Sequence, residues 1–180
     1  MEDYVGAVEM LDVADGVFDP QLSPDGSAVA YVAGRALRMV DAEGDRLVME
    51  EDDPDVSWGS AEFITGEEMG RTRGFWWSPD GDALLVERVD VGGVDQWWIS
   101  APVSPDVAPT PIRYPAAGTA NAVVGLAVLG REGARVDLDG ALEGWEYLAN
   151  AAWDAEGIWL TVQSRDQRTQ IGRASWRERV

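Results

Sequence analysis

The chain has 180 residues, with 33 acidic side chains against 14 basic ones, a formal net charge of −19, and no His or Cys. Without His or Cys it cannot complete a Ser-His-Asp site, a thiolate metal site or a disulfide framework from its own residues, and we expect no cofactor and no metal. Its negative charge repels phosphates and anionic lipids, so the expected partners include no nucleic acid and no membrane.

The N-terminal segment, residues 1–16, is acidic and contains no long apolar run, so it resembles neither a signal peptide nor a basic transit peptide. The longest apolar stretch, AVVGLAVLG at 122–130, is too short to span a bilayer. These two features predict a soluble chain with a cytoplasmic location.

Strand patterns dominate the chain. Short apolar runs bounded by Gly, Asp and Ser are typical of β-strands, and helical spacing is weak except around Glu67 and in the first dozen residues. Neighbouring side chains of a strand point to opposite faces, so Trp76 and Trp77 are expected to pack in different layers of a core. The clearest predicted strands, in chain order, are 27–33, 36–40, 82–89, 95–100 and 157–164.

A degenerate repeat underlies these strands. The sequences LSPDGSAVAYV, WSPDGDALLVE and WDAEGIWLTVQ each place a short polar turn, ending in Gly26, Gly81 or Gly157, before an apolar strand. The spacing fits four-stranded propeller blades with insertions, although three unrelated hairpins with a common turn sequence would give the same pattern. We therefore predict an all-β fold, an incomplete β-propeller of about three partial four-stranded blades. Because propellers typically have at least four blades, we expect a fragment of a larger propeller.

The C-terminal tail differs from the rest of the chain. The last ten residues, IGRASWRERV, show neither helical nor strand spacing, and five of the fourteen Arg lie from Arg165 onward. The tail resembles the translation of a common sequencing adapter, and a basic native terminus is the alternative. The expected domains are therefore residues 1–170, the propeller fragment, and residues 171–180, a non-native tail that belongs to no blade.

The adjacent carboxylates of Glu67 and Glu68 allow two interpretations. In the first, Thr65 caps a helix with Glu68 three residues further on, and Glu67 pairs with Arg71 four residues away. In the second, the two carboxylates bind a compact cation with several N–H donors, such as the α-amino group of a peptide. Two carboxylates held close together repel each other, so the pair gains most when a cation arrives.

Three segments together resemble one family. WGSAEFITGEEMGRTRGFWWSPDG at 58–81, RYPAAGTAN at 113–121 and YLANAAWDAEGIWLTVQSRDQ at 147–167 occur in the family's order. They are similar to the double-glutamate segment, the Tyr-Pro-x-x-Gly-x-x-Asn stretch and the following blade of the dipeptidyl peptidase IV family, serine exopeptidases of the prolyl oligopeptidase clan. The combination is specific, whereas the SPDG turn alone is shared by many propellers.

The resemblance implies an eight-bladed N-terminal propeller and a C-terminal α/β-hydrolase domain that supplies the catalytic Ser, Asp and His. It also implies that Glu67 and Glu68 bind the free amine of a peptide substrate, whose N-terminal dipeptide is released. The chain lacks a Gly-x-Ser-x-Gly nucleophile turn, so we expect no catalytic residue in it and no activity from it alone. The expected partners are a peptide with a free N-terminus, the chain's own hydrolase domain and a second copy in a homodimer. The alternative function is a non-enzymatic propeller that binds a protein or peptide.

Overall fold

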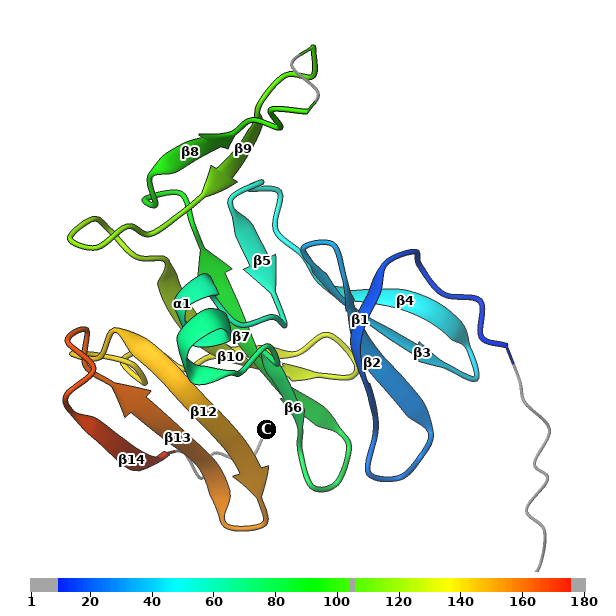
Figure 1. Ribbon diagram of the computed structural model, residues 1–180. Helices are drawn as coiled ribbons and strands as arrows, with labels where there is room; N and C mark the ends of the chain where they lie inside the picture. The colour runs from blue at the N-terminus through cyan, green and yellow to red at the C-terminus, as the bar shows by residue number, and fades with distance from the viewer. Residues whose placement is uncertain (1–9, 104–105, 176–180) are drawn as a thin grey trace, which may run out of the picture.

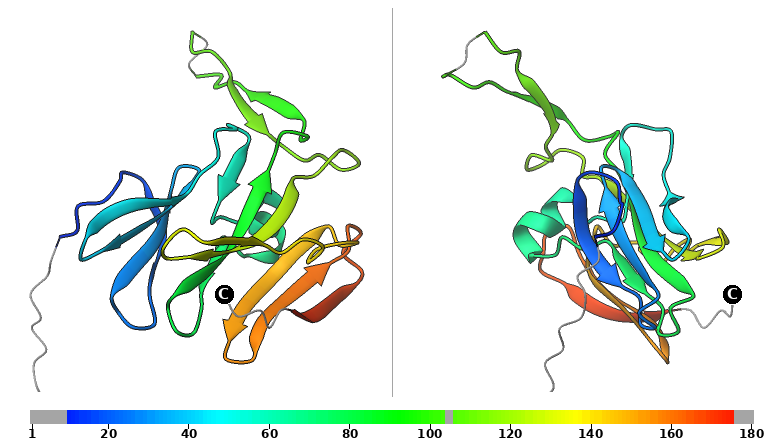
Figure 2. Two further views of the ribbon diagram at one scale, coloured as in Figure 1. Left: turned by 180° about the vertical axis from the view of Figure 1, so that it is seen from behind. Right: turned by 90° about the vertical axis from the view of Figure 1, so that its right-hand side faces the viewer.

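The computed structural model describes residues 10–103 and 106–175. In this part of the chain almost all regular structure is β. Three antiparallel sheets lie side by side, and a two-stranded hairpin projects beyond them (Figure 1). The same arrangement is visible from behind and from the side, where the hairpin again stands clear of the sheets (Figure 2).

The first sheet is a complete four-stranded blade. Each strand pairs with the next along the chain, in the order β1-β2-β3-β4, because short turns join them. Its strands are β1 (Val17–Leu22), β2 (Ala28–Ala33), β3 (Ala36–Asp41) and β4 (Gly44–Met49).

The second sheet carries two insertions. Its first strand is split, because β5 pairs with the end of β7 and β6 with its beginning, and helix α1 (Phe63–Met69) lies between the two halves in sequence. The hairpin of β8 (Gln96–Ile99) and β9 (Thr110–Arg113) lies between β7 and β10. The strands of the sheet are β5 (Val56–Trp58), β6 (Phe75–Trp77), β7 (Ala83–Asp90), β10 (Val123–Gly130) and β11 (Arg135–Asp137), with β10 between β7 and β11.

The third sheet has three strands in the described part of the chain, in the order β12 (Tyr147–Asp154), β13 (Gly157–Gln163) and β14 (Gln170–Ser175). β14 pairs with β13 along its whole length. The sheet therefore continues past residue 170, where we expected the blades to end, and the expectation that the tail belongs to no blade is wrong for 171–175. Residues 176–180 lie outside the described part, and the non-native origin of the tail stays a prediction.

The core lies between the sheets. Leu84 and Val86 of β7 pack with β2 and β3 in one apolar cluster, whereas Leu85 packs with β12 and β13 in a second. Alternate side chains of a strand point to opposite faces, so both faces of the second sheet are covered by its neighbours. Trp77 and Trp76 follow the same rule, each packing against a different cluster. This packing of sheets face to face confirms the predicted incomplete propeller.

The repeated turn joins the first and second strands of each blade, as the repeat predicts. In the first blade, Ser23 Oγ donates a hydrogen bond to Asp25 Oδ1 at 2.5 Å and accepts one from the Ala28 N–H at 3.0 Å. In the second blade, Ser78 makes the same two hydrogen bonds, with Asp80 and with the first residue of β7, at the same distances. The third copy of the repeat forms the turn between β12 and β13.

Candidate functional site

Helix α1 belongs to an excursion that leaves the second sheet after β5 and returns at β6 (Figure 1). The neck of the excursion is closed by antiparallel pairing: Ser60 bridges Arg73, and the Ala61 N–H donates to the Thr72 carbonyl at 3.0 Å. Gly74 lies so close to the opposite chain that a Cβ there would come within 2.5 Å of the Ser60 carbonyl carbon, so only glycine fits. The sheet therefore holds both ends of the helical segment.

The N-cap of the helix is Glu62 and not Thr65. The buried Glu62 carboxylate accepts hydrogen bonds from the N–H groups of Ile64 at 2.7 Å and Thr65 at 2.5 Å, and from the Thr65 hydroxyl at 2.6 Å. Gly70 ends the helix in the left-handed conformation, with φ of 69°. The first interpretation, a capping box, is therefore wrong, because Thr65 lies buried inside the helix and Glu68 lies near its end rather than in its first turn.

A buried ion pair lies beneath the helix. Arg71 Nη1 donates to Glu87 Oε2 at 2.6 Å, and Arg71 Nη2 donates to the Leu148 carbonyl at 2.6 Å. The exposed fraction of the side chain is 9% for Arg71 and 0% for Glu87. Because Glu87 lies on β7 and Leu148 on β12, the Arg71 side chain joins the second and third sheets below α1. The expected pairing of Glu67 with Arg71 is wrong, since the guanidinium is directed to these buried partners.

Burial dominates the electrostatics of this ion pair. Loss of hydration raises the pKa of Glu87 to about 7, although the charge of the adjacent Arg71 opposes the shift. Glu87 Oε1 is buried without a hydrogen-bond partner, and so is Arg71 Nε. A buried carboxylate oxygen that lacks a donor favours the neutral carboxyl form, which is why burial outweighs the neighbouring positive charge.

Glu67 and Glu68 lie on the exposed side of α1. One carboxylate oxygen of Glu68 accepts a hydrogen bond from the side-chain amide of Gln167, which lies in the turn between β13 and β14. Among the residues that the structure describes, the Glu67 carboxylate has neither a hydrogen-bond donor nor a cation as partner. The pair therefore presents unused acceptor capacity at a surface that a cation can reach.

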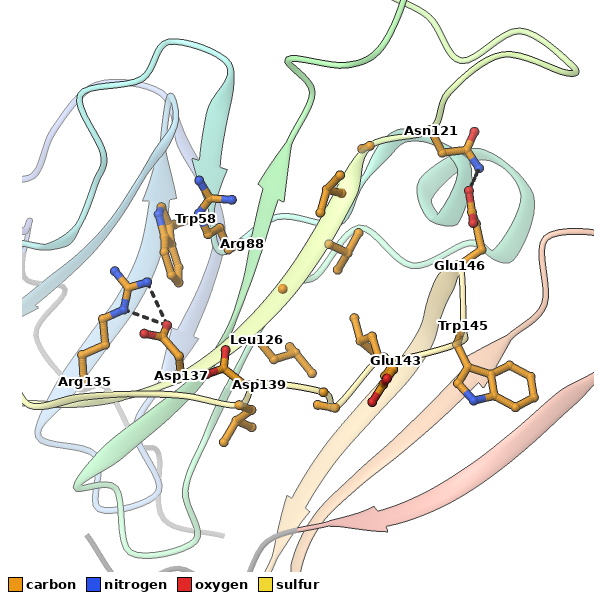
Figure 3. Close-up of a pocket in the computed structure, with 18 residues that line it drawn as sticks. Trp58, Arg88, Asn121, Leu126, Arg135, Asp137, Asp139, Glu143, Trp145 and Glu146 are labelled. Carbon is orange, nitrogen blue, oxygen red and sulfur yellow. Dashed lines mark hydrogen bonds and ion pairs between the residues drawn. The ribbon is translucent and has the colours of Figure 1, made fainter.

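The three segments that carry the family resemblance meet around α1. Phe63, at the start of the helix, contacts Tyr114 edge to face, with ring centroids 5.4 Å apart. Asn121 Nδ2 donates to Glu146 Oε1 at 2.9 Å (Figure 3). It also donates to the Tyr147 hydroxyl at 2.8 Å, so the segment before β10 is tied to the start of β12. Segments far apart in the sequence thus form one surface with the glutamate pair.

A groove of about 820 Å³ runs beside β10, from Trp58 at one end to Glu146 at the other (Figure 3). Both acidic and basic side chains line the groove. The Arg135 guanidinium lies 4.8 Å from the centre of the Trp58 ring. The glutamate pair of α1 does not line this groove, so the two are separate features of the surface.

The chemistry of this surface is that of hydrogen-bond acceptors. Within the described residues, no group of three or more acidic side chains is placed to hold a metal ion. No helix there is long and apolar enough to cross a membrane. The free carboxylate oxygens of the α1 pair are suited to an ammonium group, which donates up to three hydrogen bonds.

The geometry defines a class of structure, a propeller segment in which a helix interrupts the first strand of the second blade. Known proteins match this chain in sequence. The profile of the dipeptidyl peptidase IV (DPP IV) N-terminal region matches residues 6–174. Dipeptidyl peptidase 8 of Homo sapiens is 30% identical over 190 residues, covering 85% of this chain and 21% of the relative. The Mus musculus protein of the same name is 29% identical over 184 residues, and the match covers 83% of this chain and 20% of that protein.

Solved structures share the fold. The crystal structure of Porphyromonas gingivalis dipeptidyl peptidase 4 matches with a TM-score of 0.77 at 22% identity, covering 87% of this chain and 23% of that chain. The chain belongs to the family of the dipeptidyl peptidase IV N-terminal region, as its sequence motifs indicate. It spans about a fifth of the length of the curated relatives it matches.

Sequence reasoning missed the residues that hold the pair in place. Glu62 and Arg71 could not be recognised, because their partners come from folding and not from local spacing. For Gln167 the sequence does indicate the turn, although not the contact with Glu68. SRDQ at 164–167 repeats the Ser-x-Asp spacing of the SPDG turns, with Gln in place of Gly.

Proposed function

We propose that this chain is the substrate-anchoring part of the propeller of a dipeptidyl peptidase IV-like serine exopeptidase, and that Glu67 and Glu68 bind the free α-amino group of a peptide. The observation that carries the proposal is the exposed glutamate pair on a helix that buried contacts fix to two blades. A protonated amine matches this pair in charge and in hydrogen-bond donors.

Anchoring the amine also measures length. A fixed amino terminus places one particular peptide bond at a distant nucleophile, which accounts for the release of dipeptides by such an enzyme. The bond-breaking Ser, Asp and His belong to an α/β-hydrolase domain of the complete protein. This chain contains no His, so we expect it to hydrolyse nothing by itself.

We propose three partners for the chain: a peptide with a free N-terminus, the hydrolase domain of the same protein, and a second copy in a homodimer. The exposed apolar side chains of the β8–β9 hairpin, among them Trp98 and Ile99, support the homodimer. A cytoplasmic location is part of the proposal.

The decisive experiment compares Glu67→Gln and Glu68→Gln with the wild type in the complete enzyme, on substrates with free and blocked N-termini. Each carboxylate accepts a charge-assisted hydrogen bond worth about 1.5–3 kcal/mol, so kcat/KM on the free substrate should fall roughly ten- to a hundredfold. Blocked substrates should be poor for every form, and melting temperatures should barely change because both side chains are exposed. Wild-type kcat/KM in the Gln variants on free substrates would show that the pair is no anchor.

The groove beside β10 supports a second candidate, a propeller that binds a protein or peptide without cleaving it. The groove has about 820 Å³ and is separate from the glutamate pair. In that case the coding sequence beyond this chain would contain no nucleophile turn, and reversing the charge of Arg135 would weaken partner binding, with Glu67→Gln as the neutral control.

A further inference from the structure

The turn between β13 and β14 has the same architecture as the two SPDG turns. Ser164 Oγ donates to Asp166 Oδ1 at 2.6 Å and accepts from the Thr169 N–H at 3.1 Å. The backbone N–H of the fourth residue of the turn donates to the carbonyl of its Ser at 2.9 Å in all three turns. One hydrogen-bond pattern therefore forms three times, twice with SPDG and once with SRDQ.

The three turns differ at that fourth residue. Gly26 and Gly81 adopt φ of 72° and 79°, the left-handed region that glycine enters without a steric penalty. Gln167 holds the same place with φ of 56°. A left-handed conformation brings the Cβ of a side chain too close to its own backbone, so Gln is a poor residue for this turn. Strained positions of this kind are concentrated at functional sites.

The Gln167 side chain reaches the glutamate pair. Its amide nitrogen donates a hydrogen bond to Glu68 Oε2, across 99 positions of sequence. An ionised carboxylate is an acceptor only, so the nitrogen of the amide, and not its oxygen, must face Glu68.

A second contact holds the same turn over this surface. Arg165 Nη1 donates to Glu146 Oε1 at 2.7 Å, and the Arg165 guanidinium also donates to the Thr119 carbonyl. Because Glu146 also accepts from Asn121, the turn is attached to the segment that carries the Tyr-Pro-x-x-Gly-x-x-Asn motif. The contacts of Arg165 therefore hold the turn in the position from which Gln167 reaches α1.

We infer that Gln167 is a positioning residue for amine recognition: it is kept in an unfavourable backbone conformation because its amide orients the Glu68 carboxylate. This inference rests on the proposed function. One Glu68 oxygen is held by Gln167, and the other oxygen and the Glu67 carboxylate remain for the substrate amine. The alternative is that Gln167 serves only the turn, and it predicts that Gln167→Gly would stabilise the turn without any effect on substrate recognition.

The test uses the complete enzyme with two variants of the residue. Gln167→Gly restores the residue that the turn favours, and Gln167→Asn tolerates a left-handed φ but is one methylene too short to reach Glu68. Loss of one hydrogen bond to a carboxylate should lower kcat/KM on free N-termini by about three- to tenfold in both variants, with blocked substrates unaffected. The melting temperature of Gln167→Gly should equal or exceed that of the wild type.

A matched control is available in the same region. Gln170→Ala removes the same type of side chain three residues later, at an exposed position whose side chain has no partner among the described residues. Its kcat/KM on free N-termini should match the wild type. In a Glu68→Ala background, Gln167→Gly should have no further effect, because its partner is gone.

The outcomes separate the inference from the function on which it rests. If Gln167→Gly keeps wild-type kcat/KM on free substrates while the Glu68 variant loses it, the inference is wrong and the anchor stands. If Gln167→Gly lowers kcat/KM equally on free and blocked substrates, or lowers the melting temperature, its role is structural and the inference is again wrong. If the Glu67 and Glu68 variants also keep full activity on free substrates, the anchor itself fails.

Discussion

Two insertions extend from the second sheet, and they differ in how far their contacts with the rest of the molecule are buried. Helix α1, between β5 and β6, is fixed by buried polar groups: Glu62 is 4% exposed, Thr65 0% and Arg71 9%. The β8–β9 hairpin, between β7 and β10, has four exposed residues in β8 and stands clear of the sheets (Figure 2). Its Trp98 and Ile99 side chains are 62% and 56% exposed.

The difference shows what each insertion requires. Charged groups that bind a ligand must be held in position before the ligand arrives, because ordering them during binding costs affinity. Buried polar contacts to two sheets provide this for α1, at the cost of desolvating an ion pair. The hairpin carries exposed apolar side chains instead, and its position depends on partly exposed contacts such as the pair between Arg113 and Asp55.

The largest expected effect comes from removing the cation beneath α1. Arg71→Met leaves two buried acceptors, the Glu87 carboxyl group and the Leu148 carbonyl, without their donor, and the free energy of unfolding should fall by about 3–5 kcal/mol. Arg113→Met is the matched control. Arg113 Nη2 lies 2.7 Å from Asp55 Oδ2, a similar distance, but both side chains are 32% exposed. There the loss should be only about 0–1 kcal/mol. Urea unfolding followed by Trp fluorescence measures both, and equal losses would contradict the comparison.

The next effect is a pH dependence of the same ion pair. The Glu87 carboxyl has an ordinary pKa of 4.5 and a pKa of about 7 in the folded state. The folded state therefore keeps a proton that the unfolded state has lost, and this contribution to stability, complete below about pH 4.5, disappears as pH rises through about 7. The free energy of unfolding of the wild type minus that of Glu87→Gln should fall over this range by roughly 3 kcal/mol, at 1.36 kcal/mol per pKa unit. A constant difference between pH 4.5 and 8 would show that burial does not raise this pKa.

A smaller effect is expected at the cap of α1. Glu62→Ala removes the acceptor of two backbone N–H groups in the first turn, and helix caps contribute about 0.5–2 kcal/mol. In the complete enzyme the same variant should lower kcat/KM on free N-termini, because the glutamate pair moves with the helix. A stability loss with unchanged kinetics would mean that the helix need not be fixed for anchoring.

The smallest effect is expected on the hairpin. Trp98→Ser replaces a mostly exposed side chain that contributes to neither apolar cluster, so the free energy of unfolding should change by no more than about 0.5 kcal/mol. Thermal melts of the variant and the wild type provide the measurement. A loss of several kcal/mol would mean that the hairpin is packed as tightly as α1.

Local patterns predicted the framework, and partners from distant strands decided the site. The SPDG turns and the opposite faces of Trp76 and Trp77 follow from alternation and turn chemistry, which operate over a few residues. The cap of α1 could not be predicted this way, because Thr65 fits a local capping pattern but folding buries it and leaves Glu62 as the cap. The role of Gln167 depends on a contact across 99 positions, which no local pattern contains.

Competition between two small ligands tests the anchor most directly. A dipeptide with a free amine and its N-acetylated form are each measured as inhibitors of the complete enzyme, in the wild type and in the Glu67→Gln/Glu68→Gln double variant. The free amine should bind the wild type at least about tenfold more tightly than the acetylated form, and this ratio should fall to near one in the double variant. An unchanged preference for the free amine in the double variant would contradict the assignment of Glu67 and Glu68 as the substrate anchor.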